Sequence, residues 1–406
     1  MNKPFKVYIS RPDDISGDTG VSIALPATPF EISDALEQAR VTNERDIYTV
    51  EMESCKLRYL TRLIPPSANI YELNHLAQRL TELAGDQFDC FEGMVKMETA
   101  ENGSAPIPLE RLINFTHSME ECHFVFRVYD DQALGRFYVD NDFPVIPPNL
   151  PEALYEMLDY ESIGRKARVD EGGVFTHGGY VVQGGEIAEH YHSGDAVPKE
   201  KPNHTVLLEV CKGYFHAPEY DSGQTARLML PTAGYQLAEA VTAVGAASTE
   251  ECVFTAVDCI VPALTEHITD ALEADFGSYG MVSELAEQLA RLEQKGLLTT
   301  YKAMLAAAPE DIMLEEAHDL SCEVEGVILS RELASCSDYA KEQLRKCGVP
   351  LLDELCGMAN LHKYGGRLME ENRVQYTPYG LLRSVDGRTM EEVLGRKSPE
   401  QGMEMK

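Results

Sequence analysis

The sequence predicts an α+β protein made of two tandem copies of an elongated unit, each built from small α/β subdomains. Three observations favour this class. Short strand-like segments alternate with stretches of helical periodicity. The same order of segments returns in the second half of the chain, which is typical of a duplicated unit. Hydrophobic residues make up 44% of the 406, which is enough to bury more than one core.

The first copy opens with two short strands and a helix. Residues 7–9 and 21–25 are rich in aliphatic side chains and flank the polar turn Arg11-Pro12-Asp13-Asp14. A helix with Pro29 near its start is expected next. Its apolar side chains recur at helical spacing, at Ile32, Ala35, Leu36 and Ala39.

The second half repeats this plan from Val206. Residues 25–36 align without gaps on 230–241, and the aromatic, aliphatic and acidic positions agree. After a small insertion, the helical pattern at 72–80 matches that at 284–292. Near the end of each copy three landmarks keep one offset of 201 residues: Gly164, Phe175-Thr176 and Gly179 precede Gly365, Tyr376-Thr377 and Gly380. A chance match would not preserve one offset at three places.

These landmarks divide the chain into four parts. The first copy is expected at 1–182, a linker rich in Gly, Pro, Lys and Glu at 183–205, a diverged second copy at 206–383, and a flexible tail at 384–406. Breaks at Pro65-Pro66 and Phe143-Pro144 predict three small subdomains in a row within the first copy. Such a row favours an elongated shape.

Both copies are strongly acidic. The chain has 67 Asp and Glu side chains against 35 Lys and Arg, which gives a net charge of −32, with −17 in residues 1–200 and −15 in the remainder. This balance argues against direct binding of nucleic acid or of an anionic membrane. It predicts a basic protein partner.

The cysteines and the apolar runs indicate the cellular compartment of the protein. The ten cysteines contain no C-x-x-C pair, which favours reduced thiols over a disulfide framework or a zinc ribbon. The N-terminus lacks the apolar stretch of a signal peptide, and no apolar run approaches the ~18 residues of a membrane span. A cytoplasmic protein without a membrane segment is therefore expected.

No motif predicts catalysis. Glycine pairs at 172–173, 178–179 and 184–185 lack the phosphate-loop pattern and alternate with Val, Phe and Tyr, which is typical of a hairpin. Glu189-His190-Tyr191-His192, with His204 nearby, offers metal-ligand types but lies in the predicted linker, where no rigid surroundings would hold a metal. We therefore predict no catalytic residue, no cofactor and no metal site, and expect that the chain is not an enzyme.

Carboxylates recur in rows with few interleaved Lys or Arg. In a helix expected to begin near Pro151, Glu152, Glu156 and Asp159 are spaced i, i+4 and i+7 and would share one face, with Glu161 close by. Like charges at this spacing cost local stability. An ordinary solvated face explains any one such row, whereas several rows together favour a role in binding a partner.

Further rows complete the candidate partner-binding set. The second half repeats the spacing and the first half adds three acidic pairs: Asp311, Glu315, Asp319 and the adjoining Glu316; then Glu120-Glu121, Asp130-Asp131 and Asp140 with Asp142. Duplex DNA carries one charge per about 1.7 Å of axis, so the net charge along one elongated body would match about 54 Å of duplex. Such a protein would compete with DNA for the Lys/Arg groove of a DNA-binding enzyme.

Four segments resemble the ArdA antirestriction proteins of conjugative elements and phages. They are Val-Tyr-Ile at 7–9, Ile-Tyr-Glu-Leu-Asn-His-Leu at 70–76, Leu-Ile-Asn-Phe-Thr-His-Ser-Met-Glu-Glu at 112–121, and Leu-Asp-Tyr-Glu-Ser-Ile-Gly-Arg at 158–165. The last is the most specific, because it is similar to the family's ending Y-I-D-Y-x-A-Y-G-R. The resemblance covers most of 1–182 and, more weakly, 206–382.

The resemblance implies an elongated DNA mimic that binds a type I restriction–modification enzyme in place of DNA. The family's proteins are usually dimers, and the double length leaves open whether this chain forms a homodimer or whether its fused pair replaces one. Three alternatives remain: mimicry aimed at another defence nuclease such as a CRISPR effector, an acidic scaffold without mimicry, and a metal-dependent enzyme at His190 and His192.

Overall fold

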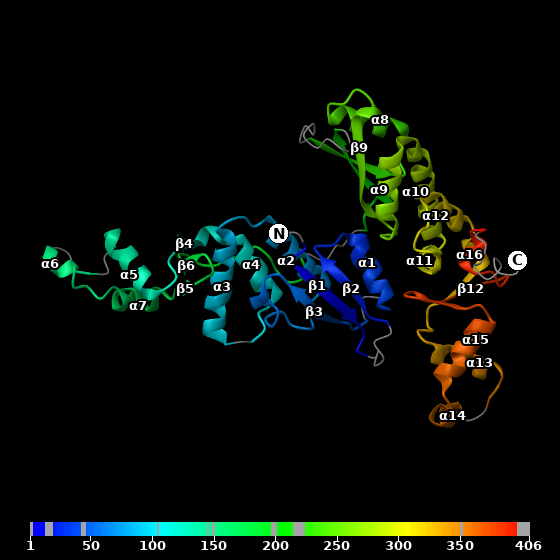
Figure 1. Cartoon of the computed structure of the whole chain (residues 1–406), viewed down its shortest axis with the longest axis horizontal. Helices are drawn as coiled ribbons and strands as arrows, with labels where there is room; N and C mark the ends of the chain where they lie inside the picture. The colour runs from blue at the N-terminus through cyan, green and yellow to red at the C-terminus, as the bar shows by residue number, and fades with distance from the viewer. Residues whose placement is uncertain are drawn as a thin grey trace, which may run out of the picture. The chain divides into compact units, whose positions relative to one another are not determined.

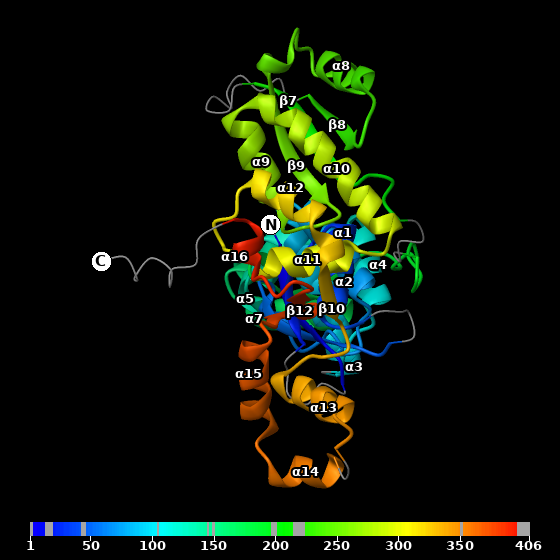
Figure 2. The same ribbon diagram turned by 90° about the vertical axis from the view of Figure 1, so that its right-hand side faces the viewer.

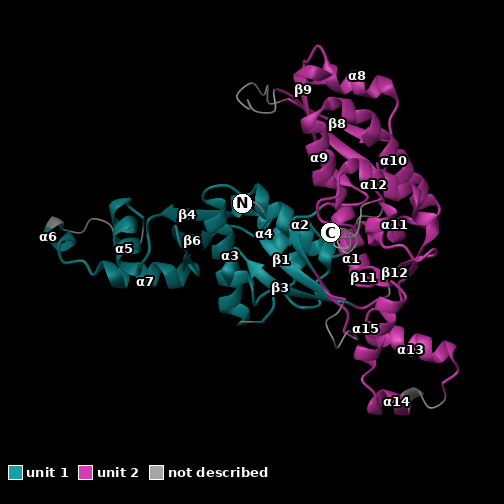
Figure 3. Ribbon diagram, turned by 45° about the vertical axis from the view of Figure 1, so that its right-hand side comes forward, with its two compact units in different colours: residues 1–9, 22–27, 48–199 teal, residues 10–21, 28–47, 200–406 magenta. Residues whose placement is uncertain are grey.

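The chain divides into two compact units. The computed structural model describes residues 3–12, 19–41, 46–103, 105–143, 146–147, 151–195, 201–213, 224–349 and 352–395 (Figure 1). Unit 1 comprises 1–9, 22–27 and 48–199, and unit 2 comprises 10–21, 28–47 and 200–406 (Figure 3). Both contain helices and small antiparallel sheets, so the predicted α+β class is confirmed. Part of the predicted turn at 11–14 lies outside the described residues.

Unit 1 begins with a three-stranded sheet in the order β2-β1-β3. Its strands are β1 (Phe5–Ser10), β2 (Val21–Leu25) and β3 (Thr49–Cys55). Side chains alternate along β1, so Phe5, Val7 and Ile9 are buried. Helices α2 (Ile70–Glu82), α3 (Gln87–Asn102) and α4 (Leu109–His117) follow. The apolar stripe of α2, which includes Leu73 and Leu80, is buried in the core.

A second three-stranded sheet of unit 1 has the order β4-β6-β5. The central strand β6 (Gly179–Gln183) pairs antiparallel with β4 (Cys122–Phe126) and with β5 (Val174–Phe175). Gly172 ends the preceding helix in the left-handed conformation, at φ 69°. The glycine-rich stretch is thus a hairpin, as the sequence predicts.

Three helices lie between β4 and β5 in the chain: α5 (Asp131–Asp140), α6 (Glu152–Tyr155) and α7 (Tyr160–Glu171). Helices α5 and α7 meet at two glycines. A Cβ atom on Gly164 would lie 1.8 Å from the Asp131 carbonyl oxygen, and one on Gly135 would lie 1.9 Å from the Tyr160 carbonyl oxygen. Only glycine permits so close an approach of two backbones.

Unit 2 also contains two three-stranded sheets, and each has the strand order of its counterpart in unit 1. Its first sheet is β8-β7-β9, made of β7 (Val206–Lys212), β8 (Thr225–Leu230) and β9 (Cys252–Cys259), with α8 (Gly234–Ala243) after β8. Helices α9 (Leu264–Ala274) and α10 (Tyr279–Gln294) lie over this sheet, followed by α11 (Leu298–Ala307) and α12 (Leu314–Cys322) (Figure 2).

The second sheet of unit 2 has the order β10-β12-β11. It is made of β10 (Val327–Ser330), β11 (Gln375–Thr377) and β12 (Gly380–Ser384), all antiparallel. Helices α13 (Cys336–Lys346), α14 (Leu352–Met358) and α15 (Leu361–Glu371) lie between β10 and β11 in the chain, and α16 (Met390–Val393) follows β12.

Helix α1 (Pro29–Gln38) is part of unit 2, although it precedes every other helix that the structure describes. Its N-cap Thr28 and Glu31 form a reciprocal capping box, which explains why the helix begins there. Phe30 belongs to the large hydrophobic core of unit 2 and packs edge-on against His204, with ring centroids 5.4 Å apart.

The predicted linker and tail are partly folded. The side chain of Asn114 holds the segment before residue 195, because its Oδ1 accepts from Tyr191 N at 2.8 Å and its Nδ2 donates to Tyr191 O at 2.9 Å. Tyr191 itself is buried. In the predicted tail, Met390 is fully buried in the core of unit 2. Residues 196–200 and 396–406 lie outside the described residues.

Candidate partner-binding surface

The candidate surface comprises the fourteen carboxylates predicted to bind a basic partner. The side chain of Glu152 lies outside the described residues. Asp131 and Glu316 are half-buried. The other eleven are exposed: Glu120, Glu121, Asp130, Asp140, Asp142, Glu156, Asp159, Glu161, Asp311, Glu315 and Asp319.

The helix expected to carry Glu152, Glu156 and Asp159 on one face does not form, so this prediction was wrong. Helix α6 ends at Tyr155, and Asp159 is the N-cap of α7. The Asp159 carboxylate accepts from Ser162 N at 3.2 Å and from Ser162 Oγ at 2.6 Å, and these hydrogen bonds lower its pKa. The capping signal therefore starts a new helix where the acidic spacing alone suggested a continuous one.

The acidic row of the second half is partly on one helix. Glu315 and Asp319 lie four residues apart on α12 and are both exposed. Asp311 precedes the helix, because α12 begins only at Leu314. Glu316 caps the same helix, since its Oε2 accepts from Met313 N at 2.9 Å. The predicted spacing thus holds for two of the three carboxylates in the row.

Asp131 joins two helices, a role that the sequence did not reveal. Its Oδ1 accepts from Arg168 Nε at 2.7 Å, and its Oδ2 lies 3.7 Å from Arg165 Nε; both arginines are on α7. Hydrogen bonding by Arg168 holds the pKa of Asp131 below its usual value. Glu161 also pairs with Arg165. Arg165 thus contacts both Asp131 and Glu161, and the two arginines neutralise part of the charge of these carboxylates.

Asp130 and the pair Asp140 and Asp142 lie at opposite ends of α5. Asp130 is the N-cap, and its Oδ1 accepts from Ala133 N at 2.7 Å. A negative charge is favourable there because of the helix dipole, whereas Asp140 and Asp142 lie at the C-terminal end, where the dipole opposes them. Helix stability therefore explains Asp130 but not Asp140 and Asp142. Glu120 and Glu121 lie in a 3₁₀ turn before β4.

The side chains of His190 and His192, which were considered as metal ligands, are exposed, but their backbone is held. His204 is half-buried, and its Nε2 lies 3.0 Å from Asp258 Oδ2. His190 N donates to Asn114 Oδ1 at 3.0 Å, and His192 N donates to Asp195 Oδ2 at 2.9 Å. The ring of His190 lies 5.7 Å from the ring of His117 between centroids. The expectation that this segment is a linker without rigid surroundings was thus wrong. Among the described residues, no three His, Cys, Asp or Glu side chains are grouped so that they could hold a metal ion.

Two features of the structure were not predicted from the sequence. One is a cleft beside α7 that contains Tyr138 and Phe143; the aromatic residues near the end of α5 were its signal. The other is a buried ionic cluster in unit 2, where Lys302 Nζ lies 2.7 Å from Asp34 Oδ1 and 3.0 Å from Glu37 Oε2. No local pattern marks that cluster, because its members are far apart in the chain.

Comparison with known proteins identifies one family. Residues 18–182 match the family described as Antirestriction protein (ArdA), so the resemblance is confirmed over this segment. No curated protein matches the chain. No helix within the described residues is long and apolar enough to cross a membrane.

Proposed function

We propose that this chain, ArdA-like over residues 18–182, is a DNA mimic that occupies the DNA-binding groove of a type I restriction–modification enzyme and blocks it stoichiometrically. The family match carries the proposal, because it assigns antirestriction to the segment that holds most of the candidate carboxylates. The inhibition is one of binding and not of catalysis, and the chain uses no cofactor.

The exposed carboxylates support mimicry of DNA. Eleven of the candidate side chains face solvent, and Asp140 and Asp142 are placed against the dipole of their own helix. Charges retained at a cost to local stability are expected where a partner uses them. A basic groove would be attracted electrostatically, and the association would weaken with salt as that of DNA does.

The proposal includes a tandem duplication of the family's unit. The sheet orders β2-β1-β3 and β4-β6-β5 correspond to β8-β7-β9 and β10-β12-β11. Gly164 and Gly365 make the same kind of contact, since a Cβ on Gly365 would lie 1.8 Å from the Cys336 carbonyl oxygen. These correspondences support a second, diverged copy outside the matched residues.

The same turn also closes both hairpins. Thr176 Oγ1 donates to Gly179 O at 3.1 Å, and Thr377 Oγ1 donates to Gly380 O at 2.7 Å. The second copy therefore retains the fold signals of the first while its acidic residues differ. This supports a model in which both copies fold alike and each presents its own charges.

A titration of a purified type I restriction–modification enzyme with the full chain tests the proposal. Inhibition should saturate near one chain, or one dimer, per DNA-binding complex, and DNA added at fixed salt should relieve it by competition. Time-dependent inactivation at far below one equivalent, not reversed by DNA, would refute the proposal in favour of an enzyme. Absence of inhibition here, with DNA-competed binding to a CRISPR effector, would retain the mimicry and change the target.

A further inference from the structure

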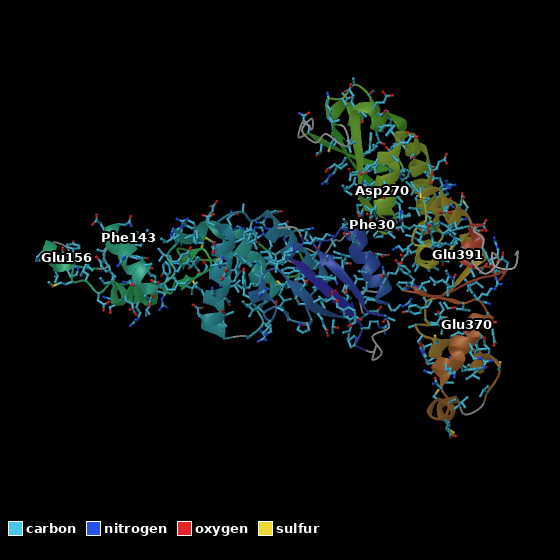
Figure 4. All side chains as sticks on the ribbon, in the orientation of Figure 1. Phe30, Phe143, Glu156, Asp270, Glu370 and Glu391 are labelled. Carbon is cyan, nitrogen blue, oxygen red and sulfur yellow. The ribbon has the colours of Figure 1, made fainter. Side chains whose placement is uncertain are left out.

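Arg40 occupies a position where the corresponding helix of the chain is followed by glycine. Figure 4 marks Phe30 in the first turn of α1, and Arg40 follows the end of the same helix. Continuing the alignment of 25–36 with 230–241 places Arg40 opposite Gly245, and the same pair of backbone hydrogen bonds closes α1 and α8 at these residues. Both residues are left-handed, at φ 60° and 74°. Glycine is the usual residue there, because a side chain adds strain, so the arginine is retained at a cost.

The side chain of Arg40 is buried with only part of its hydrogen-bonding capacity used. The residue is 8% exposed, and its Nη1 donates to the carbonyl oxygen of Tyr379. Its Nε and Nη2 are buried as well, and neither donates to an acceptor among the described residues. Buried donors without an acceptor are rare because each costs free energy, and a bound ion is one of the few explanations for them.

The two nitrogens of Arg40 without an acceptor lie on the same edge of the guanidinium group. Their N–H bonds run parallel, and this fork matches the two oxygens of a carboxylate or of a phosphate group. A carbonyl group offers only one oxygen, and the carbonyl of Tyr379 accepts from the other terminal nitrogen. The whole fork is therefore available to a ligand that brings two oxygens together.

The carboxylates closest to this fork are held by other cations. Asp34 Oδ1 and Glu37 Oε2 lie 2.7 and 3.0 Å from Lys302 Nζ. Glu37 Oε1 also lies 3.3 Å from Arg331 Nη2. Three cations, Arg40, Lys302 and Arg331, thus meet two carboxylates in this cluster. A buried charge is costly unless it is paired, so one further negative charge would complete the cluster.

The neighbourhood of Arg40 is polar and borders solvent. Tyr376, Arg331 and Glu332 act electrostatically on the guanidinium group, and all three side chains are exposed. Burial lowers the pKa of Arg40, and the groups that raise it, Tyr376, Glu37 and Glu332, do not offset burial. An arginine stays charged at neutral pH in spite of such a shift. The fork therefore presents a positive charge that the protein compensates only in part.

We propose that the Nε–Nη2 fork of Arg40 binds an oxyanion, one carboxylate or one phosphate group, and that this anion completes the ionic cluster between α1 and α11. The left-handed backbone of Arg40 supports the proposal, because such strain is typical of ligand-binding positions. The net charge of −32 repels anions from the surface in general, so binding depends on the fork. The site includes none of the fourteen candidate carboxylates, and it goes beyond the proposed function without depending on it.

Calorimetric titration of the full chain tests the inference, with inorganic phosphate and acetate as separate probes at neutral pH and at an ionic strength held constant with chloride. We expect one site per chain for at least one of the two anions, and the anion that binds identifies the group. Arg40→Gly introduces the residue of the corresponding position after α8 and should abolish binding. Arg40→Lys keeps the charge but removes the fork, so it should weaken binding about 10- to 100-fold.

Arg345→Gln is the matched control, because it removes an arginine from an exposed ion pair with Glu342 and should leave the affinity unchanged. The unfolding midpoint in chloride shows whether each variant is folded, and Arg40→Lys decides the test if Arg40→Gly is not. The anion that binds should raise the midpoint of the wild type but not that of Arg40→Gly. The inference is overturned if the wild type binds neither anion, if a folded Arg40 variant keeps the wild-type affinity, or if Arg345→Gln loses as much affinity as they do.

Discussion

The Tyr379 hydroxyl donates to the Asp34 carboxylate, 345 residues away in the chain, at 3.0 Å from each oxygen. Lys302 lies against the same carboxylate and against Glu37, and it is only 5% exposed. Burial lowers the pKa of Lys302, but the two carboxylates outweigh that effect and raise it. This cluster fastens α1 to α11 and to the turn between β11 and β12.

Lys302→Met should destabilise unit 2 strongly. Removing the lysine leaves Asp34 and Glu37 without their buried cation, a loss that typically costs about 3–5 kcal/mol. Chemical unfolding of the full chain would measure the change. Lys295→Met is the matched control, because Lys295 pairs with Glu325 in an exposed position and its loss should cost less than about 1 kcal/mol. Equal effects of the two variants would contradict the assignment.

The stability that Glu37 contributes should be lost in acid. Burial raises its pKa, but Lys302, Thr299 and Arg331 together outweigh that effect, so the pKa of Glu37 is lowered. A lowered folded-state pKa gives stability that is present above the unfolded value of about 4.3 and disappears as the pH falls through the folded value. Unfolding midpoints measured from neutral pH to below pH ~4 should fall less steeply for Glu37→Gln than for the wild type. Parallel curves would show that Glu37 does not titrate in this way.

Two adjacent glycines of α15 should respond in opposite directions. Gly365→Ala places a Cβ 1.8 Å from the Cys336 carbonyl oxygen, so α13 and α15 must separate, at a cost of about 1–3 kcal/mol. Gly366→Ala meets nothing within 4 Å and should be neutral or stabilise the helix by up to about 1 kcal/mol. Thermal unfolding of the two variants is the measurement. A destabilised Gly366→Ala would contradict this assignment, because alanine has the higher helix propensity and its Cβ would meet nothing within 4 Å at this position.

Neutralising carboxylates in one unit at a time should reveal which unit contacts the enzyme that we propose as the partner. Asp140→Asn, Asp142→Asn and Glu156→Gln remove three exposed charges of unit 1, whereas Glu315→Gln and Asp319→Asn remove two of unit 2. Each lost contact should reduce the salt slope of binding by about 1, and each single change should weaken binding only modestly. A slope that only the unit 1 set alters would assign the contact to that unit. If one single change abolished binding, a discrete docking residue would replace the distributed surface.

Local signals made much of the fold predictable. The hairpin after α7 follows from its glycines, and Gly164 with Gly365 could be recognised by their common offset because each has a backbone reason to be glycine. The prediction of one acidic helix face at 152–159 was wrong. The acidic spacing fits a continuous helix, but Asp159 caps a new helix instead. The cleft escaped prediction, since it exists only where α5 and α7 cross. The packing of α1 escaped it too, because its partner Lys302 lies 265 residues beyond Glu37.

The place of α1 has a consequence for any attempt to cut the chain between its halves. A fragment that ends near residue 200 would keep α1 but lose the part of unit 2 from residue 200 onward, which holds Lys302, Tyr379 and most of the core around Phe30. In that fragment the apolar face of α1 would be exposed, and Asp34 and Glu37 would lack Lys302. The complementary fragment would expose the apolar residues and Lys302 that α1 covers in the full chain. The two halves are therefore not interchangeable modules, and separately expressed pieces should aggregate alone and recombine when mixed.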